Sequence, residues 1–235
     1  MKVVFDAIVL RRINYRDNSF IITCFTLQEG MKSFVVSGGK KKSNLSVLHP
    51  LSLVEMEINI WDENRLGKAV RVSSNPPMIQ MTTNPIKSGI AFFLAELIEN
   101  CLKSDAIDTK CYEFLRNEIN YLEECRELNM YPLYFLVSFT HYLGIRPNVM
   151  VANMKYFDLA NGIFVDHLET KNNLQGSSVM LLNNLLECTK EEAIRMKINK
   201  VERNKFINDF MMYYKYQIEG FKTPKSLAIL QVLFS

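Results

Sequence analysis

The most pointed chemical feature of the sequence is a glycine-containing turn at residues 37–43, which carries three consecutive lysines, Lys40, Lys41 and Lys42. Adjacent ammonium groups can neutralise phosphates and release their counterions, so this turn could contact the backbone of a nucleic acid. A solvated loop whose lysines only keep the protein soluble explains the same residues equally well when the turn is considered alone. Other cations are needed to decide between the two interpretations.

Further basic residues are spread over the N-terminal third of the chain, with a tyrosine among them. The net charge of +3 conceals an asymmetry, because Lys and Arg exceed Asp and Glu only within residues 1–80. Cations on several connections of one small β domain, with an aromatic ring beside them, are typical of a groove that binds single-stranded nucleic acid. The candidate contacts are Arg11, Arg12, Tyr15 and Arg16 between the first two strands, Lys32 at the start of the third strand, and Lys68 and Arg71 in the fifth.

Residues suited to catalysis or metal binding are few. The three histidines, His49, His141 and His167, have no metal-ligand spacing, and each is more typical of a surface or packed position than of a ligand. Asp158, Asp166 and His167 flank a predicted hairpin and could form an acid/base set, but strand alternation would place Asp166 and His167 on opposite faces. We therefore expect no catalytic residues and no enzyme activity.

Spacing also argues against a nucleotide-binding loop and a cysteine framework. Gly39 and Lys40, with Ser43 nearby, share part of the P-loop pattern, but that motif needs a glycine where Phe34 stands. The cysteines are odd in number and widely spaced, without a CxxC pair, so we expect no disulfide framework, no metal and no cofactor. They are Cys24, Cys101, Cys111, Cys125 and Cys188.

No segment is predicted to enter a membrane. Asp6 interrupts an N-terminal apolar run that is too short for a signal peptide. The longest apolar stretches elsewhere are broken by Glu96, Glu99 or His141 before they reach the roughly 20 residues of a bilayer span. We expect a reducing, cytoplasmic setting.

Residues 1–77 are predicted to form a β domain. The clearest strand is at residues 53–60, where Val54, Met56, Ile58 and Ile60 alternate with polar residues, the period of a strand with one wet face. Five short strands in so few residues indicate a closed barrel of the OB type, which commonly handles nucleic acid. The other four are expected at residues 3–10, 20–26, 31–37 and 68–72.

Residues 78–235 are predicted to form a helical domain, so the fold class is α+β. The boundary is placed at residues 73–77, where two serines, an asparagine and two prolines end the strand pattern. Asn84 as N-cap and Pro85 at the first helical position open a core helix that reaches Leu102. Asn161-Gly162 between β-forming segments predicts a small hairpin at residues 156–165. Further helices are expected at residues 109–122, 131–143, 178–187, 200–218 and 225–233, the last with Thr223 as cap and Pro224 in its first turn.

Two groups of residues in the 200–218 segment have ordinary structural explanations. Phe206, Phe210, Met211 and Tyr214 recur at helical spacing, so we interpret them as core. The basic residues near the start of this helix are offset by glutamates, so we interpret them as a solvated face. They are Arg195, Lys197, Lys200, Arg203 and Lys205.

Several sequence blocks, taken in order, resemble the RecO family of recombination mediators over nearly the whole chain. The N-terminal blocks are Ile8-Val9-Leu10-Arg11, Tyr15, Phe25-Thr26, Glu29-Gly30, the lysine turn and residues 49–55. The C-terminal blocks are residues 91–96, 142–148, 156–158 and 226–227. No one block decides the resemblance; their order does.

The resemblance implies a protein that binds single- and double-stranded DNA, anneals complementary strands, and acts with RecR and the single-stranded DNA-binding protein to help load recombinase. It implies no enzyme activity, and a bacterial, nucleoid-associated location. Many members hold a four-cysteine zinc site around the hairpin. Residues 150–175 of this chain contain no cysteine, so it resembles the zinc-free branch and no metal role is carried over.

A partner site is expected in the helical domain. The acidic, apolar-tipped tail of the single-stranded DNA-binding protein needs an apolar cleft with cations at its rim, and Lys110, Arg116 and Arg146 could supply the cations. The competing interpretation is that the apolar residues around them are core and the cations merely exposed. The alternative for the whole protein is an adaptor whose barrel docks a partner protein without binding DNA.

Overall fold

The structure is a computed structural model of the chain, and it describes residues 2–16, 19–37, 46–59, 67–74, 76–102, 107–150, 154–167 and 172–234. Contacts group them into two compact units, Met1–Cys125 with Pro224–Ser226, and Arg126–Thr223 with Leu227–Ser235. The barrel and helices α1 to α3 share the first unit. The domain division at residue 77 stays a prediction.

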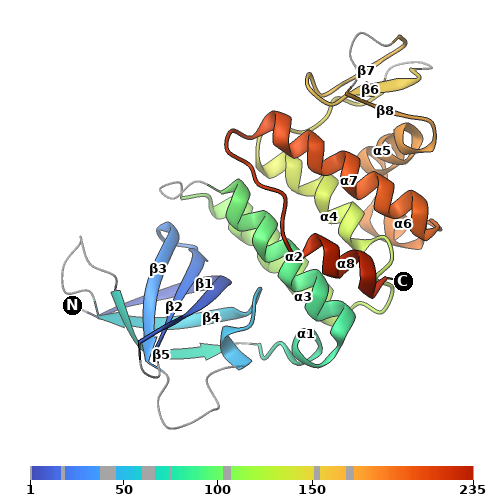
Figure 1. Cartoon of the computed structure of the whole chain (residues 1–235). Helices are drawn as coiled ribbons and strands as arrows, with labels where there is room; N and C mark the ends of the chain where they lie inside the picture. Colours follow the sequence, from blue (N-terminus) through green and yellow to red (C-terminus); the bar gives the residue numbers. More distant parts are fainter. Residues whose placement is uncertain are drawn as a thin grey trace. The chain divides into compact units, whose positions relative to one another are not determined.

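The five predicted strands are present and close into a barrel, which confirms the expected α+β fold class (Figure 1). The order around the barrel is β1-β2-β3-β5-β4, and only the β3·β5 pair is parallel. Gly67 lies at the β3·β5 closure, where an added Cβ would approach Ile58 Cγ2 at 2.8 Å. The strands are β1 (Lys2–Tyr15), β2 (Ser19–Thr26), β3 (Gly30–Ser37), β4 (Leu53–Asn59) and β5 (Gly67–Ser74).

The barrel interior is built from the alternate residues that the period-2 pattern predicted. Val54, Met56 and Ile58 of β4 all point into it, as do Phe5 and Phe34, whose ring centroids are 5.6 Å apart. A short 3-10 helix, η2 (Ser46–Leu48), contributes Leu48 to the same core. Alternation fixes which face each strand residue occupies, so the polar residues between these positions lie outside.

Strand β1 extends further than the sequence predicted. Arg11, Arg12 and Tyr15 were expected in a connection between strands, and that placement is wrong: all three lie on β1, paired with β2. Pairing continues because β2 presents β-forming residues opposite this part of β1, and because a β-bulge between Val9 and Arg11 absorbs the change of register.

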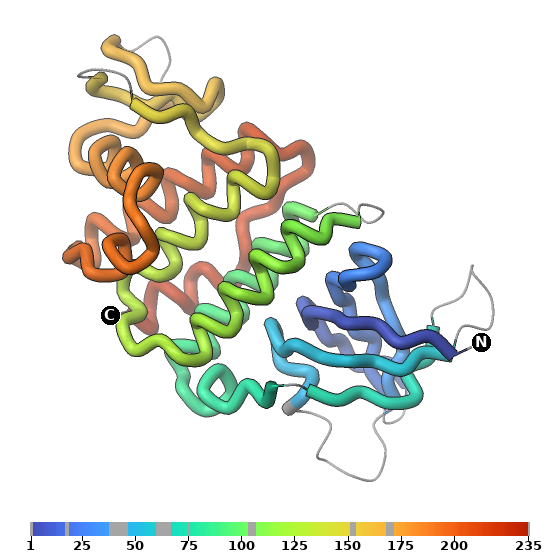
Figure 2. The backbone as a smooth tube through the Cα atoms, turned by 180° about the vertical axis from the view of Figure 1, so that it is seen from behind, coloured from blue at the N-terminus to red at the C-terminus, as the bar shows by residue number. Residues whose placement is uncertain are grey.

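Three helices complete the first unit. α2 (Pro85–Cys101) begins as predicted, with the Asn84 side chain accepting from the N–H groups of Ile86 and Lys87. α3 (Thr109–Glu124) is capped by Asp108, and Figure 2 shows it running beside α2. α2 contacts β1, which is why both faces of that strand are buried from Ala7 to Leu10.

A short helix, α1 (Ile79–Thr83), precedes α2 and was not predicted. Its N-terminal N–H groups are satisfied by a distant side chain, because Glu123 of α3 accepts from Gln80 N at 2.6 Å and from Met81 N at 2.9 Å. A cap that comes from another element leaves no signal in the local sequence.

The second unit packs helices with a three-stranded sheet of order β7-β6-β8. The predicted hairpin is confirmed, and Gly162 takes a positive φ of 70° in its turn. The third strand, β8, was not predicted. Figure 1 shows the sheet beside α5. The elements are α4 (Tyr131–Tyr142), β6 (Tyr156–Asp158), β7 (Ile163–Val165), β8 (Asn173–Gln175), α5 (Ser177–Glu187), α6 (Lys190–Arg195), α7 (Lys200–Gln217) and α8 (Leu227–Leu233).

One helix starts later than predicted, and another helix was not predicted. α8 begins at Leu227 and not after Thr223. The N–H and hydroxyl of Ser226, just before it, both donate to the Glu96 carboxylate at 2.9 and 2.6 Å. α6 was missed although its signal is local: Thr189 and Glu192 form a capping box.

The 200–218 segment forms α7, and its aromatic stripe is core as predicted: Phe206, Phe210, Met211 and Tyr214 are buried. The solvated-face interpretation is wrong for Arg203, which is only 3% exposed. Its guanidinium donates to the carbonyl of Phe234 at 2.8 Å and lies over the Phe234 ring. Among the described helices, none is long and apolar enough to cross a membrane.

Candidate nucleic-acid interface

The β-bulge in β1 decides which face of the barrel carries Arg11. Up to Val9, odd-numbered residues of β1 point into the barrel core. After the bulge, Arg12 lies opposite Ile22, a core residue, and Arg11 lies opposite Thr23. Because residues directly opposite one another share a face, Arg11 is turned outward.

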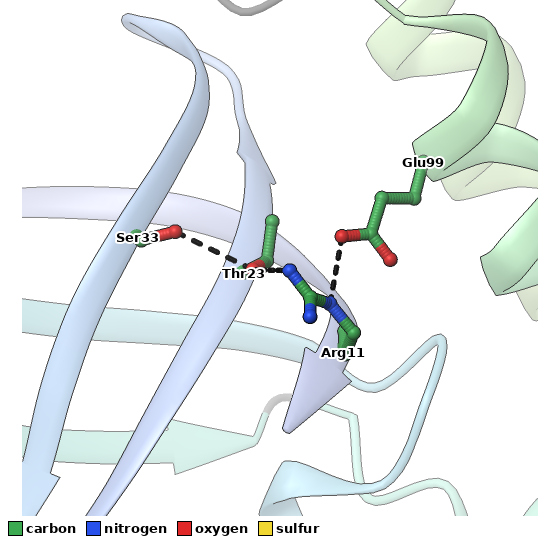
Figure 3. Close-up of polar contacts among 4 residues, drawn as sticks. All are labelled: Arg11, Thr23, Ser33 and Glu99. Carbon is green, nitrogen blue, oxygen red and sulfur yellow. Dashed lines mark hydrogen bonds and ion pairs between the residues drawn. The ribbon is translucent and has the colours of Figure 1, made fainter. Parts of the chain in front are cut away.

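Arg11 belongs to a polar row on the outer face of three strands (Figure 3). Its Nε donates to Glu99 Oε1 of α2 at 2.8 Å, and its Nη2 reaches Thr23 Oγ1 at 3.5 Å. Thr23 Oγ1 and Ser33 Oγ are 3.4 Å apart, which carries the row to β3. A guanidinium with two hydroxyls beside it provides hydrogen-bond donors suited to phosphate oxygens.

A second row lies two residues further along the same face. The register places Ile13, Ile21, Val35 and Lys68 opposite one another in turn on β1, β2, β3 and β5. Ile13 is 43% exposed, and Ile21 and Val35 are half-buried. This row supplies an apolar surface with an exposed ammonium at its edge.

Two arginine–aromatic pairs occur where β1 meets β2. The Arg12 guanidinium lies 5.3 Å from the ring centroid of Phe20, and that of Arg16 lies 5.3 Å from the ring centroid of Tyr15. A guanidinium over an aromatic face is attracted by the ring and keeps N–H donors for other groups. Such pairs can contact both a base and a phosphate.

The remaining barrel candidates are placed differently. Lys32 lies opposite Cys24, a core residue, so it is on the inward row, and it pairs with Glu29 at 3.4 Å. Arg71 is exposed on β5 opposite Glu57, whose carboxylate is bound by Lys2 at 2.9 Å. The structure therefore brings Arg11 and Lys68 to one face and does not bring Lys32 there.

The lysine turn itself, with Lys40, Lys41 and Lys42, lies outside the described residues. It follows β3, whose last residue is Ser37. Its role as a phosphate contact stays a prediction.

A pocket of about 510 Å³ lies between the bulged part of β1 and α2. Arg11 and Arg12 line one side, and Phe92, Glu96 and Glu99 line the other from a single face of α2. No local sequence signal connects these α2 residues with the barrel, since their position depends on how α2 packs on β1.

His49 forms part of the wall of this pocket and is packed, one of the two positions expected of it. Its Nδ1 lies 2.9 Å from the Pro50 carbonyl and its Nε2 lies 3.1 Å from Ser88 Oγ. The carbonyl can only accept, so Nδ1 carries the proton and Nε2 accepts from the serine hydroxyl. Burial lowers the pKa of His49, and the nearby Arg12 charge acts in the same direction.

Comparison with known proteins gives two matches that together span most of the chain. The model described as recombination protein O N terminal matches residues 1–74, and the model described as recombination protein O C terminal matches residues 83–227. The chain belongs to the RecO family. The resemblance of the sequence blocks is thereby confirmed.

Whole-length relatives agree with these RecO models. The protein named DNA repair protein RecO from Azobacteroides pseudotrichonymphae is 32% identical over 97% of both chains, and that from Phocaeicola vulgatus is 31% identical over 97% of both. The protein of the same name from Christiangramia forsetii is 27% identical, again over 97% of both chains.

The turn of the β6–β7 hairpin is held by a buried carboxylate. Asp158 is buried and its carboxylate accepts from the N–H groups of Ala160 and Asn161, so it holds the hairpin turn. Asp166 and His167 lie after the end of β7, and their side chains contact each other. The prediction that strand alternation places them on opposite faces is therefore wrong. Within the described residues, no group of three or more His, Cys, Asp or Glu side chains could hold a metal ion.

The three candidate partner-binding cations fall in different units. Lys110 and Arg116 are exposed on α3 in the first unit, and Arg116 pairs with Glu113 at 2.5 Å. The apolar residues Cys111, Tyr112, Leu115 and Ile119 of that helix are buried in the core. Arg146, in the second unit, donates to the carbonyl of Leu186 at 2.9 Å. Their role in partner binding stays a prediction.

Proposed function

We propose that this RecO-family chain acts in DNA repair as a recombination mediator. It binds single- and double-stranded DNA, anneals complementary strands, and helps load recombinase together with RecR and the single-stranded DNA-binding protein. It works in the bacterial cytoplasm, at the nucleoid, without a cofactor and without enzyme activity. Residues 1–77 form the DNA-binding domain, and residues 78–235 form a helical domain that binds partner proteins.

The observation that carries the proposal is the outer face of β1, β2 and β3. Arg11, Thr23 and Ser33 form a row of hydrogen-bonding groups there, beside the apolar row that ends at Lys68. A sequence-independent binder of single strands needs donors for phosphates and an apolar or aromatic surface for bases, and this face offers both within two adjacent rows.

The barrel residues divide by chemistry. Tyr15, whose ring lies under the Arg16 guanidinium, serves as the platform for a base. The cations contact phosphates and so carry little sequence information. These phosphate contacts are Arg11, Arg12, Arg16, Lys32, Lys40, Lys41, Lys42, Lys68 and Arg71.

The test is a titration of labelled single-stranded and duplex DNA with the purified protein at several salt concentrations. Each neutralised phosphate should make the logarithm of the affinity fall with the logarithm of salt, by roughly 0.7 per contact for single strands and 0.9 for duplex. An absence of binding at low salt would overturn the DNA-binding proposal. Annealing is measured separately, as the rate at which two labelled complementary strands pair.

The alternative is a protein-only adaptor, and one observation favours it. Three barrel cations already have carboxylate partners: Arg11 with Glu99, Lys32 with Glu29, and Lys2 with Glu57. Cations that only stabilise and solubilise a barrel would be paired in this way. An adaptor would show no salt-dependent DNA affinity, so the same titration separates the two functions.

The partner-binding role rests on exposed cations of the helical domain. Lys110 and Arg116 project from α3, and Arg146 follows α4. The acidic tail of the single-stranded DNA-binding protein would meet cations of one unit, either Lys110 and Arg116 or Arg146, while its apolar tip enters a neighbouring cleft. A binding assay with the tail peptide tests this role independently of DNA.

A further inference from the structure

The pocket between β1 and α2 has features that the proposed phosphate contacts do not use. It measures about 510 Å³, and all of its lining residues belong to the first unit. Phe92 in its wall is 47% exposed, although it lies on the core helix α2. A half-exposed phenylalanine ring in a hollow offers an apolar face to whatever enters.

The ring of Phe92 is held in place from the barrel side. His49 meets it edge-on, with ring centroids 5.3 Å apart and an interplanar angle of 68°. The hydrogen bonds of His49 to Pro50 and Ser88 fix the imidazole in turn. A fixed aromatic ring loses little conformational entropy when another flat group stacks on it.

The charges around the pocket indicate what kind of group could enter. Arg11 and Arg12 face Glu96 and Glu99, so the lining contains both hydrogen-bond donors and carboxylate acceptors. A phosphate or an acidic peptide would meet the two glutamates and be repelled. A nucleobase carries amino and ring N–H donors as well as carbonyl and ring-nitrogen acceptors, so it can satisfy both kinds of lining group.

Glu99 has hydrogen-bonding capacity left for such a ligand. Its Oε1 accepts from Arg11, as Figure 3 shows, and within the described residues its Oε2 has no hydrogen bond. Glu96 is differently engaged, because its Oε2 accepts from both the N–H and the hydroxyl of Ser226. Glu99, which also holds Arg11, is the acceptor on α2 that could meet a base edge.

We propose that this pocket binds one unpaired nucleobase of single-stranded DNA, stacked on Phe92 with its amino group donating to Glu99. The inference rests on the proposed DNA binding and extends it. Arg11 and Arg12 belong both to the pocket and to the proposed DNA surface, so a strand whose phosphates contact them can turn one base into the pocket. The pocket thus favours single strands, because a base within a duplex is stacked and paired.

The experiment compares the wild-type protein with Phe92→Ala and Phe92→Tyr. Tyr216→Ala, which removes a half-exposed ring from α7, is the control. Each protein is titrated with a labelled single strand and with the matching strand of abasic sugar-phosphate, which keeps the charges and lacks the bases. Unfolding midpoints verify that all four proteins are folded.

We expect Phe92→Ala to weaken binding of the ordinary strand roughly tenfold, the size of one lost base–aromatic stack. Phe92→Tyr and Tyr216→Ala should bind as the wild type does. The effect should vanish on the abasic strand, and the salt dependence should be unchanged because no phosphate contact is removed. A loss of folding would instead affect both strands equally.

Two outcomes would overturn the inference in distinguishable ways. If the wild type binds the ordinary strand and Phe92→Ala binds it equally well, the pocket does not hold a base. If the wild type binds neither strand at low salt, the proposed DNA binding fails as well.

Discussion

Arg11 on β1 and Glu99 on α2 form an ion pair at 2.8 Å on the outer face of the barrel, beside Thr23. The Arg11 side chain is 53% exposed, so water and ions reach it. An exposed pair of this kind adds little to stability. Its effect on binding is larger, because the Glu99 carboxylate takes one Arg11 donor and offsets the positive charge that Arg11 offers to a phosphate.

We expect Glu99→Gln to strengthen DNA binding several-fold, since the amide no longer competes as an anion for Arg11. The slope of log affinity against log salt should become steeper by at most roughly 0.7 to 0.9 unit, as Arg11 neutralises its phosphate more completely. Glu113→Gln is the matched control, because Glu113 forms a comparable exposed pair with Arg116 on α3. Equal changes in both variants would mean that only the net charge matters.

Changing Lys40, Lys41 and Lys42 together to alanine should weaken DNA binding about equally for all base sequences, because lysine contacts to phosphates read no bases. If all three make contacts, the salt slope should shrink by roughly 2 to 3 units. Exposed lysines of the second unit, Lys197 and Lys200, provide a control substitution. An unchanged slope would remove the turn from the DNA-binding surface.

His49 should make folding sensitive to acid. Its pKa in the folded protein is below the ordinary value of 6.5, chiefly because burial disfavours the charged imidazole. The neutral form is therefore the stabilising one: its contribution is complete above pH 6.5 and is lost as the pH falls through the folded pKa.

We expect the free energy of unfolding to fall more steeply in the wild type than in His49→Asn as the pH drops from about 6.5 towards about 5. Urea titrations at each pH measure it. His141→Asn, at an exposed histidine, controls for the loss of one imidazole. If His49→Asn and the wild type lose stability in parallel, His49 is not the group that titrates.

The purified protein should contain no stoichiometric zinc and should keep its melting temperature in chelator. A structural zinc site contributes free energy on the order of 10 kcal/mol to folding, so its removal could not pass unnoticed. Elemental analysis measures the content directly. One bound zinc per chain would contradict this prediction.

Arg116→Glu should weaken binding of a labelled acidic tail peptide, because the reversal leaves Glu113 and the new carboxylate on one face of α3. A peptide without its apolar tip should bind more weakly to the wild type. Arg195→Glu, at the end of α6, controls for net charge. Equal binding to Arg116→Glu and the wild type would exclude Arg116, and no binding to the wild type would indicate that the chain lacks this receptor.

The sequence alone determined the elements whose signals are local. Alternation at residues 53–60 predicted β4, Asn84 with Pro85 predicted the start of α2, and Asn161-Gly162 predicted the hairpin; each depends on neighbours within a few residues. Together with the ordered sequence blocks, these signals were enough for the barrel, the helical region and the RecO family.

Tertiary structure decided the features that depend on partners distant in sequence. Glu123 of α3 caps α1, and Glu96 accepts from Ser226. Arg203 can be buried because its guanidinium donates to the carbonyl of Phe234 and lies over the ring of that residue. The sequence predicts that a cation among solvated residues of a helix is exposed, because the distant acceptor that allows its burial leaves no local signal.

At the candidate site, the sequence predicted the residue types and the tertiary structure decided their positions. The residue types around Arg11 and Tyr15 were enough to suggest contacts to phosphates and bases, because charge and aromaticity belong to the residues themselves. The β-bulge after Val9 then reversed the alternation of β1, turned Arg11 outward beside Thr23, and placed it opposite Glu99 and Phe92 of α2. Only the folded chain could decide this, since a shift of one residue exchanges the two faces of a strand and depends on pairing with β2.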